Sequence, residues 1–136
     1  MGIAALITWL ITAVGGFFML SIWISRGGLR QRPTHLPVPL IFAHFLLAAA
    51  GLIVWIIYVA ADVDALAWVA FVILLPVAVL GFTMLARWLQ SRQGDAAAAD
   101  APAERSFPVP VVIGHGLFAV ITLVLVLLTA LGVGES

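Results

Sequence analysis

Four long apolar stretches dominate this sequence and restrict the folds that it can adopt. They cover about residues 3–25, 37–60, 65–89 and 108–131. Roughly 20 apolar residues in a helix cross a bilayer core, so each stretch is long enough to span it. The chain of 136 residues is 65% hydrophobic and only 9% charged, whereas soluble domains are about 25% charged. We therefore predict an all-α integral membrane protein, a four-transmembrane-helix bundle.

The two halves of the chain resemble each other, which indicates an internal repeat. The segment GFFMLSIW, which begins at Gly16, is matched by GFTMLARW from Gly81. The segment LPVPLIFAHFLLA, which begins at Leu36, is matched by FPVPVVIGHGLFA from Phe107. Each half contains two spans, so both copies cross the membrane in the same direction.

These matches predict two parallel helical-hairpin repeats related by a pseudo-two-fold axis along the membrane normal. The first transmembrane hairpin covers residues 1–61 and the second covers residues 62–136. The second hairpin has the longer connection, at residues 91–106, and it is rich in Ala, Asp and Pro. Such a composition is typical of mobile segments, so we predict a mobile cytoplasmic linker there.

The positive charges fall on one side of the predicted membrane. All six basic residues are arginines, and they lie in the loops 26–36 and 90–107 or, for Arg87, at the adjacent end of the third span. Basic loops mark the cytoplasmic side, so we expect both termini outside. Arg without Lys, together with abundant Ala, Val and Gly, suggests a bacterial plasma membrane as the location. The apolar spans predict the lipid bilayer as partner, and the zero net charge argues against nucleic acid.

His44 and His115 occupy the same place in the two repeats. Each follows the first proline of a PVP segment by seven residues, which puts both imidazoles roughly 10 Å inside their helices. The pseudo-two-fold axis can then bring them face to face. Ionisable residues inside a membrane usually face the bundle interior and serve a function. The pair is therefore a candidate for ligating a haem iron from both sides.

Other residues of the spans fit a haem site. A flat macrocycle needs small residues beside its ligands, and the candidates are Ala48, Gly51, Gly114, Gly116 and Ala119, with Gly15, Gly16 and Gly81 from the other helices. Arg87 has no basic counterpart in the first repeat and is a candidate to pair with a haem propionate. Arg26, Arg30 and Arg105 are further candidates for that role.

This arrangement resembles the four-helix, haem-carrying membrane subunits of b-type cytochromes, in which paired histidines on transmembrane helices hold haem b. The resemblance rests on His44 and His115 and covers the helical portion of the chain. It implies one haem b held by two histidines and a role in electron transport. It also implies a quinone and a redox partner protein, or a larger respiratory membrane complex, as partners.

Two alternatives remain open on the sequence. Met19 and Met84 lie at matching steps of the first and third spans, and two thioethers with two imidazoles suit copper(I). The second alternative is a non-redox accessory or scaffold subunit, or a small transporter, in which the histidines pack, sense protons or bind copper. The absence of cysteine excludes disulfides, thiolate metal sites and iron–sulfur clusters.

The remaining polar and aromatic residues have structural interpretations. We expect the aromatic residues near the ends of the spans to form interfacial belts; they are Trp23, Trp55, Tyr58, Trp68 and Trp88. Asp62 and Asp64 are predicted to cap the third helix. His35 is expected to be a solvated loop residue.

Overall fold

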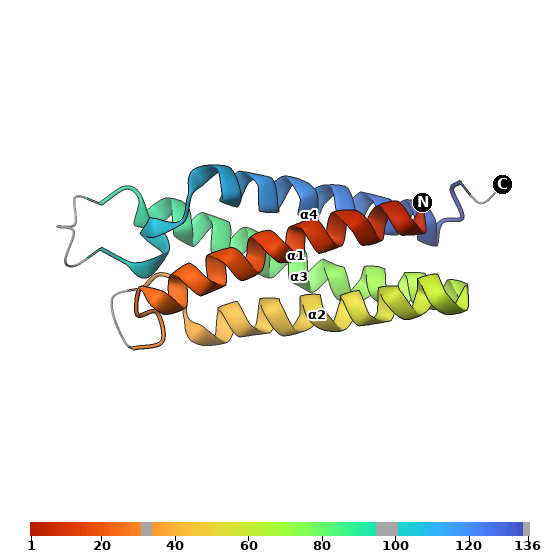
Figure 1. Cartoon of the computed structure of the whole chain (residues 1–136), viewed down its shortest axis with the longest axis horizontal. Helices are drawn as coiled ribbons and strands as arrows, with labels where there is room; N and C mark the ends of the chain where they lie inside the picture. The colour runs from red at the N-terminus through yellow and green to blue at the C-terminus, as the bar shows by residue number, and fades with distance from the viewer. Residues whose placement is uncertain (31–33, 95–100, 135–136) are drawn as a thin grey trace.

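The computed structural model describes residues 1–30, 34–94 and 101–134. These residues form four long helices and one turn of 3-10 helix (Figure 1): α1 Gly2–Ser25, α2 Val38–Ala61, α3 Asp64–Ser91, η1 Ala103–Ser106 and α4 Val109–Ala130. All four long helices are long and apolar enough to cross a membrane. The predicted four-helix membrane bundle is confirmed, and each long helix begins and ends within two residues of its predicted position.

The helix ends follow from the local sequence. Pro37 and Pro108 precede the first residues of α2 and α4, where a missing backbone N–H costs nothing. Asp62 ends α2 in the left-handed conformation, with φ of 54°. Asp64 lies in the first turn of α3, and no side chain caps that helix. The predicted capping of α3 by both aspartates is therefore wrong, because Asp62 closes the preceding helix instead.

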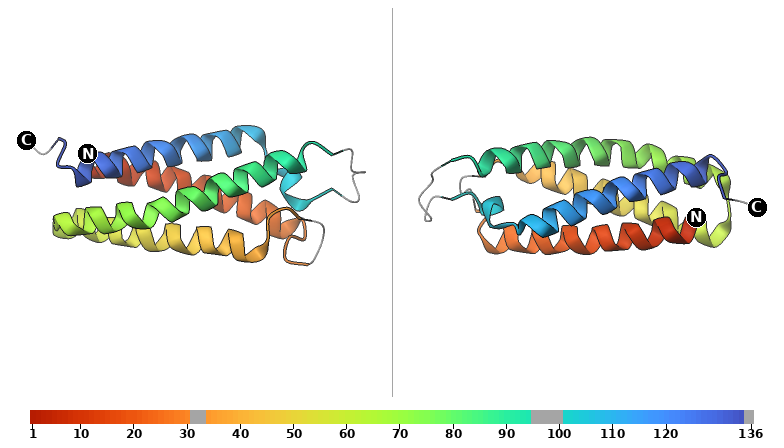
Figure 2. Two further views of the ribbon diagram at one scale, coloured as in Figure 1. Left: turned by 180° about the vertical axis from the view of Figure 1, so that it is seen from behind. Right: turned by 90° about the horizontal axis from the view of Figure 1, so that it is seen from above.

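The closest helix pairs join the two halves of the chain. α1 packs along α4 and α2 packs along α3, whereas the sequence neighbours α1 and α2 make few contacts. Both views of Figure 2 show these antiparallel pairs. The two close pairs are equivalent under the repeat, because α1 corresponds to α3 and α2 to α4. Histidine-bearing α2 and α4 consequently lie diagonally across the bundle.

Two aromatic clusters fill the interior between the helices. The outer cluster, at the end of the bundle that holds the N-terminus, contains Trp9, Trp55 and Tyr58. The inner cluster, at the opposite end, contains Trp23 and Trp88. The predicted aromatic belts are therefore wrong for Trp23, Trp55, Tyr58 and Trp88, whereas Trp68 is 42% exposed. These buried rings instead pack in the core between the helices, where each removes a large apolar area from contact with lipid.

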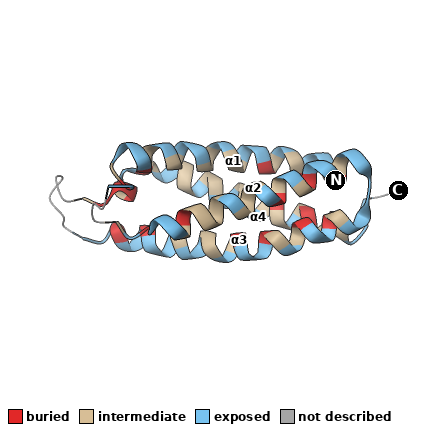
Figure 3. Cartoon of the chain, turned by 90° about the horizontal axis from the view of Figure 1, so that it is seen from below, coloured by how far each residue is buried: buried red, intermediate tan, exposed pale blue. Residues whose placement is uncertain are grey.

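The outward faces of the helices are apolar. Large hydrophobic side chains are exposed along all four of them, Val14, Ile53, Val79 and Ile113 among the most exposed. Figure 3 shows exposed residues along the outer faces, with buried ones between the helices. In water such a surface would promote aggregation, whereas a bilayer solvates it. The chain is therefore a multi-pass membrane protein.

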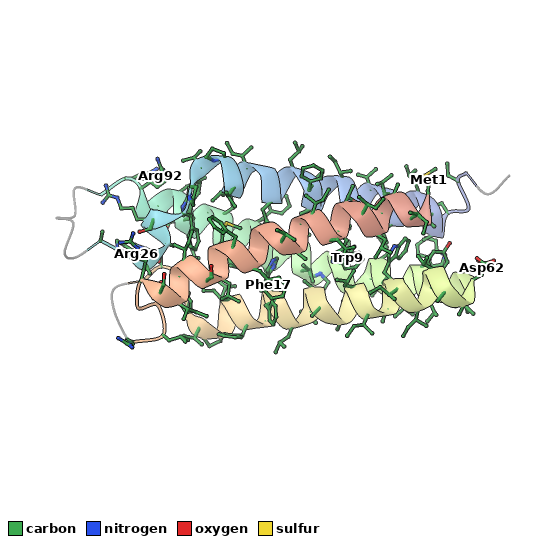
Figure 4. The ribbon with its side chains drawn as sticks, in the orientation of Figure 1. Met1, Trp9, Phe17, Arg26, Asp62 and Arg92 are labelled. Atoms are coloured by element: carbon green, nitrogen blue, oxygen red, sulfur yellow. The ribbon has the colours of Figure 1, made fainter. Side chains whose placement is uncertain are left out.

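The described arginines and aspartates lie toward opposite ends of the bundle. Figure 4 shows Arg26 and Arg92 at one end, and Met1 and Asp62 at the other. The separation agrees with the charge pattern from which the cytoplasmic side was predicted. Arg32 and Glu135 lie outside the described residues.

Part of the connection between α3 and α4 is ordered. In η1, Glu104 is fully buried, and Ala103 is 3% exposed. One oxygen of Glu104 accepts a hydrogen bond from the Thr34 hydroxyl at 2.9 Å, and the other accepts one from the His35 backbone N–H at 2.6 Å. Residues 103–106 of the predicted mobile linker thus form a 3-10 turn, and a buried carboxylate joins this turn to the loop between α1 and α2. Residues 95–100 lie outside the described residues.

His35 is only partly the solvated residue that its position predicts. Its side chain is 45% exposed, and its Nδ1 lies 3.3 Å from Glu104 Oε1. The same carboxylate therefore contacts both the backbone and the ring of His35.

Glu104→Ala is expected to lower the free energy of unfolding by about 1–3 kcal/mol, because the donors at Thr34 and His35 lose their buried, charged acceptor. Glu104→Gln keeps one oxygen and should lose less. Chemical unfolding in detergent measures the difference. The control is Asp64→Ala, an exposed acid at the other end of the bundle, expected to cost at most about 1 kcal/mol. Equal losses for Glu104→Ala and Asp64→Ala would contradict the role of Glu104.

Candidate functional site

The two membrane histidines meet inside the bundle. His44 comes from α2 and His115 from α4, and their ring centroids are 6.3 Å apart at an angle of 60°. Each lies six residues after the first residue of its helix, so both are at one depth. The two imidazoles meet across the bundle as predicted, but their rings are tilted and do not lie face to face.

Each imidazole is oriented by a backbone carbonyl of the neighbouring helix. His44 Nδ1 lies 3.0 Å from the Val77 carbonyl oxygen on α3, and His115 Nδ1 lies 2.8 Å from the Thr12 carbonyl oxygen on α1. A carbonyl only accepts, so Nδ1 carries the proton and donates it in both bonds. In a neutral imidazole this leaves the Nε2 lone pair unprotonated. Metal-ligating histidines are oriented in the same way.

Glycines on α1 and α3 make room for the rings. A Cβ atom added at Gly16 would lie 3.1 Å from His115 Cε1, and one added at Gly81 would lie 3.2 Å from His44 Cε1. Gly15 also borders His115, since a Cβ added there would lie 3.5 Å from the His115 Cβ. Gly16 and Gly81 begin the matching segments of the repeat. The repeated glycine therefore has a physical reason, which is the approach of an imidazole edge to the helix backbone.

An apolar pocket of about 170 Å³ lies beside the histidines. It is lined mainly by α3 and α4, and both His44 and His115 reach it. The predicted site residues Met19, Met84, Gly116 and Ala119 line it too, together with Gly81 and Trp88. The two thioethers and the two imidazoles therefore border one cavity.

Three small residues predicted for the site lie elsewhere. A Cβ added at Gly51 would lie 3.1 Å from Trp9 and 3.2 Å from Ile73, so this glycine serves helix packing. Ala48 packs against the outer cluster. A Cβ added at Gly114 would meet no atom within 4 Å, and this glycine does not line the pocket.

Arg87 points to a loop and not to the histidines. Its Nη1 donates to the backbone carbonyl of His35 at 3.1 Å.

Two other side chains, which the sequence did not pair with each other, carry buried hydrogen-bond donors that are free to bind a polar group of a ligand. Trp88 Nε1 and Arg105 Nη1 are buried and have no hydrogen-bond partner. Sequence reasoning placed Trp88 in an interfacial belt because the pattern of spans does not reveal which face of a terminal turn is buried.

The interface between α1 and α4 is more polar than the equivalent interface between α2 and α3. Thr122 donates a hydrogen bond to Thr8 at 2.9 Å across the α1–α4 interface. The equivalent contact between α2 and α3 is the apolar approach of Gly51 to Ile73. The surroundings of His115 are therefore more polar than those of His44 on the side away from the arginines.

No described carboxylate lines the pocket beside the histidines. Among the described residues, no group of three or more His, Cys, Asp or Glu side chains is placed to hold a metal ion. Any metal in this pocket would consequently depend on the two imidazoles, aided by thioethers or by the nitrogens of a macrocycle.

Comparison of the chain with protein-family models, with characterised proteins and with solved structures gave no match in any of the three. The functional interpretation therefore depends on the geometry of the site.

Gly16→Ala and Gly81→Ala are expected to destabilise the protein by about 1–3 kcal/mol, because the added methyl group overpacks an imidazole edge. Gly114→Ala is the matched control, since its helical position has open space around it and alanine favours helix by up to about 1 kcal/mol. Unfolding of the three variants in the same detergent gives the comparison. If all three change stability alike, the close approach of the rings to Gly16 and Gly81 is refuted.

Proposed function

We propose that this chain is a b-type cytochrome-like membrane protein that binds one haem b between His44 and His115 and transfers electrons. The observation that carries the proposal is the pair of imidazoles at one depth, each with Nδ1 hydrogen-bonded to a carbonyl and Nε2 left as a potential ligand. No other described side chains of the membrane interior combine these properties in so apolar a setting.

The distance between the rings suits a shared metal ion. Two imidazole nitrogens bound to one ion lie about 4 Å apart, given metal–nitrogen bonds of about 2.0–2.1 Å. Ring centroids at 6.3 Å are compatible with that separation. The pocket of about 170 Å³ is smaller than a porphyrin, so binding requires side chains between α3 and α4 to move aside. Gly116 and Ala119 present little bulk on the α4 wall.

Bound haem would supply one-electron redox chemistry, which the side chains of this chain lack. The residues of the chain hold and insulate it: His44 and His115 provide the ligands, and the apolar lining excludes water. Electron exchange with a quinone or a redox partner protein, or membership of a respiratory complex, belongs to the same proposal. So does the bacterial plasma membrane, with the arginine-rich end in the cytoplasm.

Protein purified in detergent from haem-replete cells is expected to show a Soret band and, on reduction, an α-band. His44→Ala and His115→Ala should each lose these bands, because either change removes one of the two iron ligands. Absorption spectroscopy with haem extraction measures the effect. His35→Ala is the matched control, since this third histidine lies in a loop beside Glu104 and its loss should leave the spectrum unchanged.

A colourless preparation that takes up no added haem would overturn the cytochrome proposal. It would favour the accessory, scaffold or small-transporter interpretation, in which the paired histidines serve packing or respond to protons.

Copper(I) is a second candidate for the bound group, and the residues that line the pocket support it. Met19 and Met84 line the same cavity as both histidines, and thioether and imidazole ligands suit this soft ion. Methionine also fills gaps in apolar interiors, so its presence there has a structural explanation as well.

Metal analysis of the purified protein separates the two candidates. A copper site predicts about one copper per chain, lost in Met19→Leu and Met84→Leu because the thioether ligands are removed. A haem site predicts that both substitutions leave the Soret band in place, because the iron is held by the histidines. Copper at background levels in the unsubstituted protein would exclude the copper site.

A further inference from the structure

Two buried hydrogen-bond donors near the arginine-rich end of the bundle lack acceptors. They are Trp88 Nε1 and Arg105 Nη1, the unpartnered buried side-chain atoms of the described residues. Leaving a buried donor unsatisfied costs free energy, and more so for a charged group. Native proteins therefore pair nearly all such groups, with protein, water or ligand. The two donors call for an acceptor that the described residues do not supply.

The repeat provides an internal comparison for Trp88. Its counterpart, Trp23, is fully buried and donates its Nε1 hydrogen to Thr34 Oγ1 at 3.4 Å. Trp88 is 5% exposed and its nitrogen has no such partner. At equivalent positions of the repeat, the indole N–H therefore has an acceptor in the first half and lacks one in the second. The difference coincides with the pocket, which Trp88 lines and Trp23 does not.

The position of Trp88 relates it to the histidine site. It follows Gly81, which borders His44, by two helical turns, so it lies on the same face of α3 roughly 10 Å nearer the arginine-rich end. Both residues line the pocket. An indole N–H at this level can reach a polar edge of a ligand whose centre lies between the histidines.

Arg105 brings positive charge to the same end. It lies in η1 between Glu104 and Phe107, and Phe107 lines the pocket and packs in the inner cluster with Trp88. The adjacent carboxylate of Glu104 is directed to Thr34 and His35. Arg87, the stronger candidate from sequence, donates to the His35 carbonyl. Arg105 is therefore the arginine with an unsatisfied buried nitrogen among the described residues.

We propose that Trp88 Nε1 and Arg105 form an anchor for a carboxylate of the molecule bound in the pocket. On the proposed function, on which this inference rests, that carboxylate is a haem propionate. The macrocycle then has its acidic edge toward the arginine-rich end and its apolar edge toward the outer cluster. A charged acceptor satisfies an arginine and an indole together, and such bonds are among the strong ones.

Reconstitution of apo-protein with haem b and with its dimethyl ester tests the anchor directly. The ester keeps the iron and the macrocycle but removes both negative charges. The unsubstituted protein is expected to bind haem b about tenfold or more tightly than the ester, because a charge-assisted bond is lost. Arg105→Gln and Trp88→Phe should weaken binding of haem b and reduce this preference. Spectroscopic titration gives the dissociation constants.

Two matched controls accompany these variants. Arg26, a propionate candidate from the sequence, is exposed, closes α1 and has no unpartnered buried nitrogen, so Arg26→Gln removes a charge at the same end without removing a buried donor. Trp23→Phe removes the indole whose nitrogen pairs with Thr34. Both should retain the preference for haem b over its ester. If Trp88→Phe fails to fold, Arg105→Gln still decides the question.

The possible failures are distinguishable. Absence of uptake of either haem would end the proposed function and this inference with it. Equal affinity of the unsubstituted protein for haem b and its ester would overturn the carboxylate anchor alone. An undiminished preference in Arg105→Gln would show that another group holds the carboxylate, and would also overturn the anchor.

Discussion

The hydrocarbon core of the bilayer offers no hydrogen bonds, and the rest of the structure follows from that constraint. Backbone groups are satisfied within the four helices, as they must be in lipid. Polar side chains have to find acceptors in the protein, so the histidines bond to carbonyls of neighbouring helices and Thr122 bonds to Thr8. An unpaired polar atom in such an interior consequently indicates a missing partner, because no water reaches it from the lipid side to form the hydrogen bond.

Packing in this bundle depends on small residues at a few positions. In a membrane no hydrophobic driving force brings helices together, so their association depends on close packing, which small side chains allow. Gly16 and Gly81 use this device to admit an imidazole, whereas Gly51 uses it to admit the ring of Trp9. The same residue type thus builds the site in one place and the core in another.

The sequence was sufficient to predict the four helices, because length and hydropathy determine which segments can span a bilayer. The meeting of His44 and His115 was predictable as well, since a repeat with an even number of spans imposes a two-fold relation. The burial of Trp23 and Trp88 was not, because hydropathy is high on every face of these helices and does not identify the inward one. Glu104 was missed for a related reason: its hydrogen-bond donors come from a loop about 70 residues away in the chain, and no local pattern records such a contact.

The pairing of α1 with α4 and of α2 with α3 has a consequence for how such a chain could arise. A single hairpin would lack its close helix partner within its own chain and would find it only in a second copy. Two hairpins would then assemble as a symmetric homodimer, with one histidine from each subunit meeting at the axis. The present chain has the geometry of that dimer, with the subunits fused through the turn at Asp62. Fusion frees the halves to differ, and the open indole of Trp88 opposite the satisfied one of Trp23 is a difference that an exact dimer could not have.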